Sequence, residues 1–550
     1  MGFHDIPLLY LITVPAAGLS AVNILFFPDI LPGTPVSKLF IGISLLNSVV
    51  YMIWSLYIYP IFFSPLRFLP QPKGGYPIIK HGTAAFQRPA GQSFLNFIKT
   101  IPNDGLIRIQ GFFHREGLLI CSPEALAEVL VHKNYDFEKP AEVRNFLVRI
   151  LGKGLILTEG DEHKFQRKHI TPAFSFRHIK ELIPVFWSRA TAMRDGMFAE
   201  MADNPEADGR KVVEVNHWAN KVTLDIIGVA GLGRDFKSLT ATNDPLVQNY
   251  EEILEPTTEK LVYFVFNLVF GRRFVSWLPW GLNQRLDTTT GNLRAFCLDL
   301  VREKREKMKI EGEGEKDILA LLIRSNCFGD DTLVDQLLTF IAAGHETTSS
   351  ALTWSLYLLA QNPSLQTALR AELRSSLPSP SAPLPDTFDL PTTLESLPLL
   401  HATTNEVLRL YPSVPSTIRL SIRPTSILDT PVPANTRIQL SPWAINRSPS
   451  LWGPDAESFN PYRWIDVDGK ANNIGGARGN NFCNLTFLHG PRSCIGERFA
   501  RSELKALLAV VVGGMEVRLE YEGQKAVPAG VITTKPRGGM RLRLGRVEGW

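Results

Sequence analysis

The stretch Phe487-Leu-His-Gly490-Pro-Arg492-Ser-Cys494-Ile-Gly496-Glu-Arg-Phe-Ala500 decides the fold of this chain. Residues 497–511, which follow the cysteine, have the alanine, leucine and charge content of a helix. Cys494 therefore lies on a loop at a helix N-terminus, where the partial positive charge of the helix end favours a thiolate. Gly490 and Gly496 allow a tight bend and leave room for a flat ligand. A lone buried cysteine is more commonly a small hydrophobic side chain, but the detailed spacing argues against that alternative.

The composition is that of a packed globular protein. The 550 residues are 45% hydrophobic, 20% charged and 10% aromatic, which excludes a disordered, collagen-like or coiled-coil chain. The net charge of +4, without a dense basic block, argues against a nucleic-acid partner. Five cysteines without a Cys-x-x-Cys pair argue against a disulfide framework and a structural zinc site, and for a reducing compartment.

Two uncharged stretches near the N-terminus predict a membrane anchor. Residues 6–27 and 39–63 are each long enough to cross a hydrocarbon core, which needs about 20 apolar residues. The alternatives are buried core helices or, because of its prolines, a re-entrant first stretch. The basic residues that follow predict a cytosolic location for the rest of the chain; they are Arg67, Lys73, Lys80 and Arg88. We expect an anchor over residues 1–68, a proline-rich extended spacer over residues 65–75 and a globular domain over residues 69–550.

The spacing F-x-x-G-x-R-x-C-x-G resembles the haem-binding loop of the cytochrome P-450 family. The resemblance makes Cys494 the axial thiolate ligand of the iron of haem b. It also implies that Phe487, Gly490, Arg492 and Gly496 belong to the haem pocket. Residues 69–550 would then form a haem-thiolate catalytic domain.

A helix is predicted over residues 331–361, with Ala343-Gly344-His345-Glu346-Thr347-Thr348 at its centre. In isolation, a Glu-Thr pair in a helix is usually a solvated surface. Beside Cys494, the stretch resembles the oxygen-activating part of the family's central helix. Gly344 would let the helix open or a ligand lie close, and Thr347 lies one turn further along the same face. The resemblance implies that Glu346 and Thr347 deliver protons to the haem site.

Glu406 and Arg409 have the spacing i and i+3, which places both on one face of a helix. The simplest alternative is a surface ion pair worth a few tenths of a kcal/mol. The pattern resembles the family's E-x-x-R motif, a structural ion pair that supports the cysteine loop. Its third member would be Arg463, within Phe459-Asn-Pro461-Tyr-Arg463-Trp464.

Two further segments resemble those that hold the haem carboxylates. One contains His163 and Arg167, and the other contains Arg419. The family usually has tryptophan where His163 stands. Histidine can donate a hydrogen bond, but its charge depends on pH.

The resemblance runs from Pro70 to Arg543 and implies a mainly helical fold with a small, largely N-terminal β-rich region. The implied activity is that of a membrane-bound monooxygenase that inserts one oxygen atom from O2 into a lipophilic molecule. Glycine-rich residues 228–233 lack the strand-turn-helix context of a dinucleotide site. The implied electron source is therefore a separate NADPH-cytochrome reductase, and the resemblance admits cytochrome b5 as a second donor.

Two other functions stay open from the sequence. A haem-thiolate isomerase or dehydratase would not use O2, and the intact Glu346-Thr347 pair argues against it. A non-catalytic haem sensor would bind CO at reduced iron without turning over a substrate. Reductase-dependent NADPH consumption separates the first of these from a monooxygenase.

Five largely apolar segments are expected to line the substrate pocket: residues 135–151, 246–280, 338–342, 414–417 and 531–534. They favour a lipophilic substrate such as a terpenoid, polyketide or fatty acid. The overall pattern looks most like filamentous-fungal members of the family, many of which serve secondary metabolism. Similarity to microsomal members implies the endoplasmic reticulum membrane, with the catalytic domain facing the cytosol.

Overall fold

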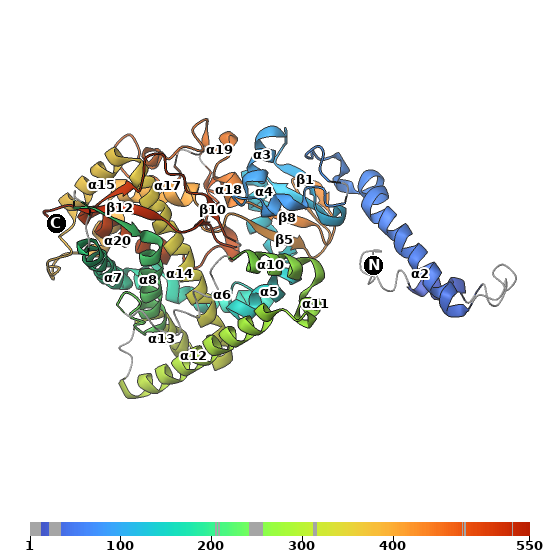
Figure 1. Ribbon diagram of the computed structural model, residues 1–550, viewed down its shortest axis with the longest axis horizontal. Coiled ribbons are helices and arrows are strands. Elements are labelled where there is room, and N and C mark those ends of the chain that lie inside the picture. Colours follow the sequence, from blue (N-terminus) through green and yellow to red (C-terminus); the bar gives the residue numbers. More distant parts are fainter. Residues whose placement is uncertain are drawn as a thin grey trace.

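The computed structural model describes residues 13–20, 22, 35–76, 78–203, 206, 209–240, 257–311, 316–475, 477, 480–530 and 532–550. Helices make up most of it, which confirms the mainly α class, and an N-terminal helix projects from the globular body (Figure 1). The α-helices are α2 (Val36–Ile53), α3 (Gln92–Thr100), α4 (Pro123–Ala127), α5 (Ala141–Leu151), α6 (Gly160–Ile170), α7 (Phe176–Ala202), α8 (Val215–Ile226), α10 (Thr258–Phe270), α11 (Arg272–Trp277), α12 (Gly281–Glu311), α13 (Ile318–Arg324), α14 (Asp330–Gln361), α15 (Pro363–Ser376), α16 (Leu390–Ser396), α17 (Pro398–Leu410), α18 (Pro442–Ile445), α19 (Pro449–Trp452) and α20 (Glu497–Gly514).

Short 3-10 or π-helical segments connect many of these helices. They are η2 (Trp54–Phe63), η3 (Pro65–Phe68), η4 (Gly82–Phe86), η5 (Phe112–His114), η6 (Glu128–His132), η7 (Asn134–Asp136), η8 (Thr171–Phe174), η9 (Ile227–Leu232), η10 (Pro461–Trp464), η11 (Asn481–Cys483) and η12 (Gly490–Arg492).

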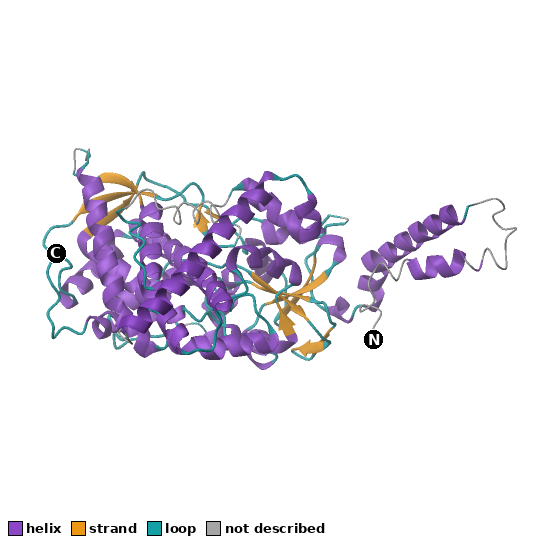
Figure 2. Cartoon of the chain, turned by 90° about the horizontal axis from the view of Figure 1, so that it is seen from below, coloured by secondary structure: helices purple, strands orange, loops and turns teal. Residues whose placement is uncertain are grey.

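The strands form two main sheets, which lie at opposite ends of the globular body (Figure 2). The larger sheet has the order β1-β2-β8-β5-β3, and the smaller has the order β4-β12-β9. Two further strand pairs, β6–β7 and β10–β11, are hairpin-like. The strands are β1 (Leu106–Gln110), β2 (Glu116–Ile120), β3 (Phe137–Glu138), β4 (Lys211–Glu214), β5 (Thr417–Ser421), β6 (Thr425–Ile427), β7 (Thr430–Val432), β8 (Arg437–Leu440), β9 (Met515–Leu519), β10 (Pro528–Ala529), β11 (Lys535–Pro536) and β12 (Arg541–Arg546).

The larger sheet is only partly N-terminal. Its β1–β2 hairpin is antiparallel, with Leu106 opposite Ile120. Strand β8 then pairs in parallel with β2, and β5 pairs with β8, so the C-terminal half of the chain completes the sheet. Parallel strands need a long connection, and local sequence patterns do not reveal which strands such a connection joins.

Helix α14 runs through the centre of the domain and is buried over most of its length. Its buried residues are mainly apolar and occur on all sides of the helix, as expected for a core helix. Trp354 is fully buried and stacks on Tyr411, with ring centroids 4.2 Å apart. Asp330 and Asp331 occupy the first turn, where their negative charges interact favourably with the helix dipole.

Among the described residues, one helical segment, Val36–Phe63, is long and apolar enough to cross a membrane, with a mean hydropathy of 1.8. It coincides with the second predicted span. The first predicted span, residues 6–27, lies largely outside the described residues.

The anchor packs against the globular domain. Arg108 of β1 donates to the carbonyl of Pro60 at 2.8 Å, and His114 Nδ1 contacts the carbonyl of Leu56. Leu66 is fully buried, and the Pro70 carbonyl accepts from the Arg108 backbone N–H at 2.9 Å. The extended spacer predicted over residues 65–75 is wrong in its first part, because residues 65–68 form the 3-10 helix η3 and the burial of Leu66 draws this segment onto the sheet.

Candidate haem-thiolate site

Cys494 follows η12 and precedes α20, as the sequence predicts. Its backbone N–H donates to the Phe487 carbonyl at 2.8 Å, which closes the loop on itself. Cys494 is exposed where it borders a cavity of about 720 Å³, and Phe487 and Arg492 line the same cavity. The Arg501 guanidinium lies 4.8 Å from the centre of the Phe487 ring and covers the loop from the α20 side.

The protein surroundings do not by themselves make Cys494 a thiolate. Burial raises the pKa of the thiol to about 11. A backbone hydrogen bond from Gly496 and the charges of Arg167 and Arg501 act in the opposite direction but do not outweigh burial. The helix end acts in the expected direction, but in the protein alone burial outweighs it. A coordinated metal ion deprotonates a thiol outright, so the thiolate would come with the metal.

The two loop glycines have different surroundings. Gly490 has φ +75°, and a Cβ there would lie 2.0 Å from the carbonyl oxygen of Leu130 in η6. Only glycine permits both this conformation and this close approach. At Gly496 the nearest atom to a Cβ is a Phe174 carbon 3.9 Å away. Neither glycine is among the residues that line the cavity, so the need for glycine at Gly490 comes from backbone packing.

Helix α14 brings Glu346 and Thr347 to the same cavity as Cys494. The Thr347 hydroxyl donates to the Ala343 carbonyl at 2.7 Å. Gly344 lies between them in sequence but does not line the cavity; a Cβ there would lie 3.0 Å from Ile227 Cδ1. The structure thus places Gly344 where α14 packs closely against η9, which differs from the expected opening toward a ligand.

Glu346 has a partner that the sequence analysis missed. Lys535 Nζ, from β11, lies 3.1 Å from Glu346 Oε1, and each side chain retains 11% exposure. Nothing in the local sequence marks Lys535, because its partner lies on a helix far away in the chain.

Basic side chains gather at one end of the cavity. The residues of this cationic cluster that line the cavity are Lys139, His163, Arg167, Arg419 and Arg492. Burial and the charges of Arg419 and Arg492 together lower the pKa of Lys139 to about 7, although Glu159 acts in the opposite direction. Burial likewise lowers the pKa of Arg419 to about 10. Lys139 was also missed, because nothing in its neighbourhood distinguishes it from a surface lysine.

Arg492 and Arg167 both fasten the cysteine loop. Arg492 Nη1 donates to the carbonyls of Asn134 at 2.6 Å and Phe137 at 2.7 Å, and its Nη2 lies 2.5 Å from Glu159 Oε2. Within the described chain, Nε of Arg492 has no hydrogen-bond partner although it is buried. Arg167 Nη1 donates to the Ser493 carbonyl at 2.6 Å, next to Cys494.

His163 is neutral near pH 7. Burial and the neighbouring cations, Arg492 first among them, lower its pKa to about 4. Its Nδ1 lies 3.4 Å from the Tyr135 hydroxyl. At neutral pH it can therefore donate a hydrogen bond but adds no charge.

Residues from all five segments that were predicted to line the substrate pocket line this cavity. Its largely apolar wall includes α5, the start of α10, the middle of α14, residues 414–417 and residues 532–533. Of the predicted segment 246–280, residues 246–256 lie outside the described part of the chain. Additional lining comes from residues 81–88 and 111–113, which the sequence analysis did not include.

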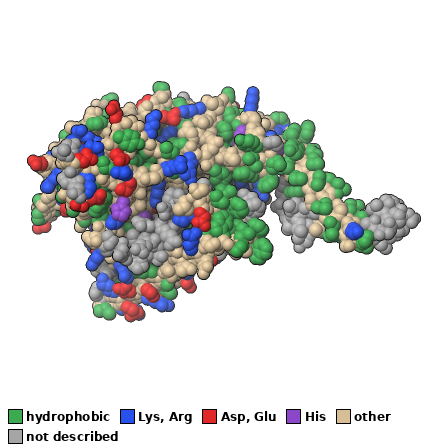
Figure 3. Space-filling model, viewed as in Figure 1, with side chains coloured by type: hydrophobic (Ala, Val, Ile, Leu, Met, Phe, Trp, Pro, Cys, Tyr) green, Lys and Arg blue, Asp and Glu red, His purple; other side chains and the backbone are tan. Residues whose placement is uncertain are grey.

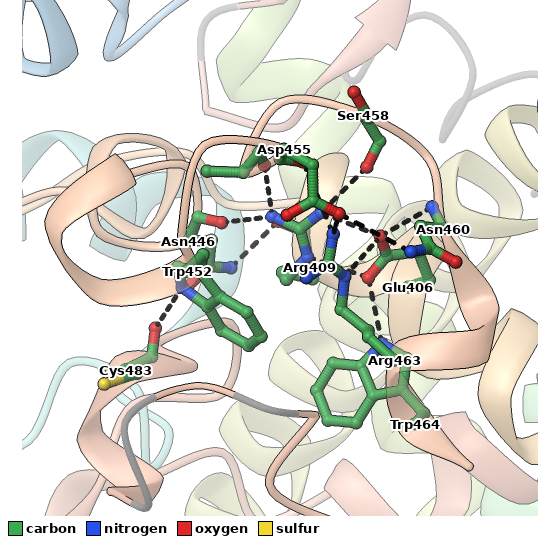
Figure 4. A network of polar contacts seen from close by, with 11 residues as sticks. Glu406, Arg409, Asn446, Trp452, Asp455, Ser458, Asn460, Arg463, Trp464 and Cys483 are labelled. Carbon is green, nitrogen blue, oxygen red and sulfur yellow. Dashed lines mark hydrogen bonds and ion pairs between the residues drawn. The ribbon is translucent and has the colours of Figure 1, made fainter.

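Glu406 and Arg409 are fully buried, and together with the largely buried Arg463 they form one network (Figure 4). Both Glu406 oxygens accept from Arg409 at 2.8 Å, and Arg463 Nε lies 3.1 Å away. The backbone N–H of Asn460 and the Trp464 indole donate to the same carboxylate at 2.9 Å. The remaining Arg409 N–H groups donate to backbone carbonyls, those of Asn446, Ala456 and Ser458.

This network reaches the cysteine loop through Asn446. Arg409 Nη1 donates to the Asn446 carbonyl at 2.6 Å. The Asn446 side chain accepts from the Leu485 backbone N–H and donates to the Thr486 hydroxyl, both at 2.8 Å. Leu485 and Thr486 directly precede Phe487, so the ion pair and the loop share one set of hydrogen bonds.

The side chains of the cavity fit a haem. Cys494 offers a sulfur ligand at the wall. The cationic cluster has Glu159 as its nearby carboxylate and leaves the Arg492 Nε without a partner among the described residues. Two additional carboxylates, such as those of haem, would balance this charge.

Comparisons with known proteins agree with this geometry. Residues 83–540 match the model of the protein family described as Cytochrome P450. The chain is 39% identical over 539 residues to the cytochrome P450 monooxygenase sphH of Aspergillus fumigatus, which covers 98% of this chain and 96% of that protein. It is 38% identical to ALT8 of Alternaria alternata, with 92% and 93% covered, and 38% identical to FUM15 of Gibberella moniliformis, with 90% of each covered; both are cytochrome P450 monooxygenases.

Proposed function

This chain belongs to the cytochrome P450 family and is a monooxygenase, and from that premise we propose that it holds haem b on the Cys494 thiolate and oxidises a lipophilic small molecule. The observation that carries the proposal is one cavity lined by Cys494, by Glu346 and Thr347, and by the cationic cluster. In the proposed reaction one oxygen atom of O2 enters a C–H bond of the substrate, and the other leaves as water after uptake of two electrons from NADPH and two protons.

When bound, haem supplies the activation of O2, which amino-acid side chains cannot perform. The chain supplies the ligand sulfur of Cys494 and the cations that hold the two haem carboxylates. Within the cationic cluster we assign that role to Lys139, Arg167, Arg419 and Arg492, to which His163 adds a neutral hydrogen-bond donor.

Glu346 and Thr347 are assigned to proton delivery. The Thr347 hydroxyl lies on the cavity wall, and its hydrogen bond to Ala343 is to the helix's own backbone. The hydroxyl can therefore turn toward the cavity without disturbing another side chain. The Glu346 carboxylate, one residue earlier, can take up a proton and release it at the same wall.

Electrons are proposed to come from NADPH through a separate NADPH-cytochrome reductase, with cytochrome b5 as a second donor. P450 monooxygenases generally need such a partner. Residues Ile227–Leu232 are helical and end at Gly233 in the left-handed conformation. This segment is not a strand-turn-helix phosphate site, which supports an external electron source.

The apolar cavity supports a lipophilic substrate, and we propose a terpenoid or polyketide of fungal secondary metabolism, with fatty-acid hydroxylation as the alternative. Terpenoids, polyketides and fatty acids all have a large apolar surface, which suits the apolar lining of the cavity. The relatives named above are fungal monooxygenases, which is why we favour fungal metabolites.

We place the protein at the endoplasmic reticulum membrane, with the catalytic domain in the cytosol. The segment Val36–Phe63 serves as the anchor. Hydrophobic side chains also gather along the anchor and over α10 and α11 (Figure 3). Trp277 at the end of α11 is 80% exposed, as expected for a side chain at a membrane surface.

The first experiment replaces the ligand. Cys494→Ser should abolish the strongly red-shifted Soret band of the reduced CO complex, because a hydroxyl does not supply a thiolate. Cys327→Ser, a cysteine away from the cavity, serves as the control and should keep the band. An unchanged band in Cys494→Ser would overturn the proposal.

The second experiment identifies the substrate. Membranes that contain the protein and a reductase are incubated with NADPH and extracts of the native host, and metabolites that gain the mass of one oxygen atom are recorded. Such products should require NADPH and O2 and be absent from Cys494→Ser membranes. Products of unchanged mass that form without O2 and NADPH would indicate an isomerase instead.

A further inference from the structure

The ion pair between Glu346 and Lys535 joins the central helix to the C-terminal β11 strand. It has a separation of 3.1 Å and is largely shielded from solvent. Such a pair needs good geometry, because desolvating two charges is costly and their attraction must offset that cost.

The backbone next to Lys535 is fixed against α14. The Thr534 carbonyl accepts from the Trp354 indole at 3.0 Å and from the Ser350 hydroxyl, both on α14. The Thr534 N–H donates to the Ser413 carbonyl at 2.8 Å. Lys535 is therefore presented to Glu346 by a rigid segment of the protein, so the contact does not depend on a freely moving chain end.

The neighbouring histidine does not provide the positive charge. Burial, together with the charge of Lys535, lowers the pKa of His345 to about 3. His345 is consequently neutral near pH 7, and the cation beside Glu346 is Lys535.

A second carboxylate shows what happens to a buried glutamate without a cation. Glu503 of α20 is 1% exposed, and neither carboxylate oxygen has a hydrogen-bond partner among the described residues. Burial raises the pKa of Glu503 well above its ordinary value and so favours its protonated form. Glu346 differs from Glu503 by having Lys535 as a partner.

We propose that Lys535 is a positioning residue that keeps Glu346 ionised and fixes it at the cavity wall beside Thr347. What Glu346 does there rests on the proposed function, but the pairing itself does not. An ionised Glu346 can accept a proton from solvent and pass it toward Thr347. A protonated Glu346 has no free site for an incoming proton until it has given up its own.

Infrared spectroscopy of the haem-loaded, full-length protein in detergent tests the pairing. Lys535→Met removes the charge and keeps the length of the side chain. The variant spectrum should gain one protonated carboxyl C=O band that shifts in heavy water. The double variant Lys535→Met/Glu346→Gln should lack that band, and Lys535→Arg should match the wild type. Glu503→Gln calibrates the measurement, since it should lose one such band.

Absence of a new band in folded Lys535→Met would overturn the proposal. If Lys535→Met yields no haem-loaded protein, the amount of haem-loaded protein in the double variant tests the pairing instead. Removing Glu346 as well relieves the stranded carboxylate, so recovery of haem-loaded protein supports the pairing. Failure of both variants contradicts it.

A matched lysine separates positioning from general stability. Lys304 and Asp317 form another buried pair, 2.6 Å apart with 6% exposure on each side, and neither lines the cavity. With a substrate identified by the extract experiment, Lys535→Met should raise the share of NADPH electrons released as hydrogen peroxide severalfold, and Lys304→Met should not. The infrared result does not depend on turnover. A wild type without oxygenated product would refute the proposed function and leave the pairing intact.

Discussion

The two buried carboxylates Glu406 and Glu346 differ sharply in how many groups hold them. Glu406 accepts hydrogen bonds from four residues and is completely buried. Glu346 has the single ion pair to Lys535 and borders the cavity. A carboxylate with every lone pair occupied holds its surroundings in one arrangement, whereas one with free acceptor capacity can exchange a proton. The first region therefore stabilises the cysteine loop, and the second is available for chemistry.

The largest effect is expected from breaking the Glu406 network. Arg409→Ala leaves Glu406 buried without its main cation, which costs about 3–5 kcal/mol out of an ordinary stability of about 5–15 kcal/mol. Haem-loaded protein should therefore hardly accumulate, as measured by haem absorbance per amount of chain. Glu406→Gln should behave in the same way.

The control for this prediction is Arg423→Ala. Arg423 is paired with Asp136 but is 64% exposed, so its loss should change stability by less than about 1 kcal/mol. Normal haem content in Arg409→Ala, with only slower turnover, would contradict the structural role.

A smaller loss of stability is expected at Gly490, which belongs to the structural region. Gly490→Ala forces a left-handed conformation that costs roughly 1–2 kcal/mol and pushes the loop away from the Leu130 carbonyl. On α14, Gly344→Ala meets a movable Ile227 side chain and gains about 1 kcal/mol of helix propensity. Urea unfolding should show a clear loss for the first variant and little change for the second. Equal losses would show that the two glycines have the same role.

Lowering the pH should reduce the free energy of unfolding through His345, the neighbour of Glu346 on α14. The folded-state pKa of His345 is about 3, below the unfolded value of 6.5, so the folded protein favours the neutral ring. This stability is fully present above pH 6.5 and is lost as the pH falls from 6.5 toward 3, by up to about 1.4 kcal/mol per pH unit. Unfolding free energies at pH 7, 6 and 5 should fall less steeply in His345→Gln. Parallel profiles for the two proteins would rule out this contribution.

The smallest effect on stability is expected at Thr347, where the effect on the reaction is specific. Thr347→Ala removes one hydrogen bond to the helix's own backbone and leaves a better helix former, so haem content should stay normal. NADPH consumption should continue while hydrogen peroxide replaces product, because the cavity loses the hydroxyl that directs a proton. The ratio of peroxide to product per NADPH measures this.

Thr353→Ala is the matched control for Thr347. Its hydroxyl donates to the Ser349 carbonyl at 2.8 Å on the same helix, but Thr353 does not line the cavity. The ratio of peroxide to product per NADPH in Thr353→Ala should equal that of the wild type. An unchanged ratio in Thr347→Ala would show that Thr347 takes no part in the reaction with O2.

Much of the architecture could be predicted because it depends on local patterns. The helix predicted over residues 331–361 is α14, Asp330–Gln361, and the helix after Cys494 is α20. The i, i+3 spacing of Glu406 and Arg409 was sufficient to place them on one face, because helix geometry is independent of the rest of the chain.

Other features depend on segments that meet only in the folded protein. Strands β5 and β8 complete a sheet begun by β1 and β2, and no local signal selects that pairing. Lys139 and Lys535 look like ordinary surface lysines in the sequence. Their roles arise because folding buries them beside charges from distant helices and strands.

The Cys494 thiol shows the same division within one residue. Its position on a loop before a helix follows from the sequence, and so does the favourable direction of the helix dipole. Its pKa depends on how much water the surrounding protein removes, and here burial outweighs the dipole and the nearby arginines. Local spacing determined which residue can bind a metal. The tertiary structure alone decided the pKa of the thiol in the protein without metal, because desolvation is the sum of contacts from the whole cavity wall.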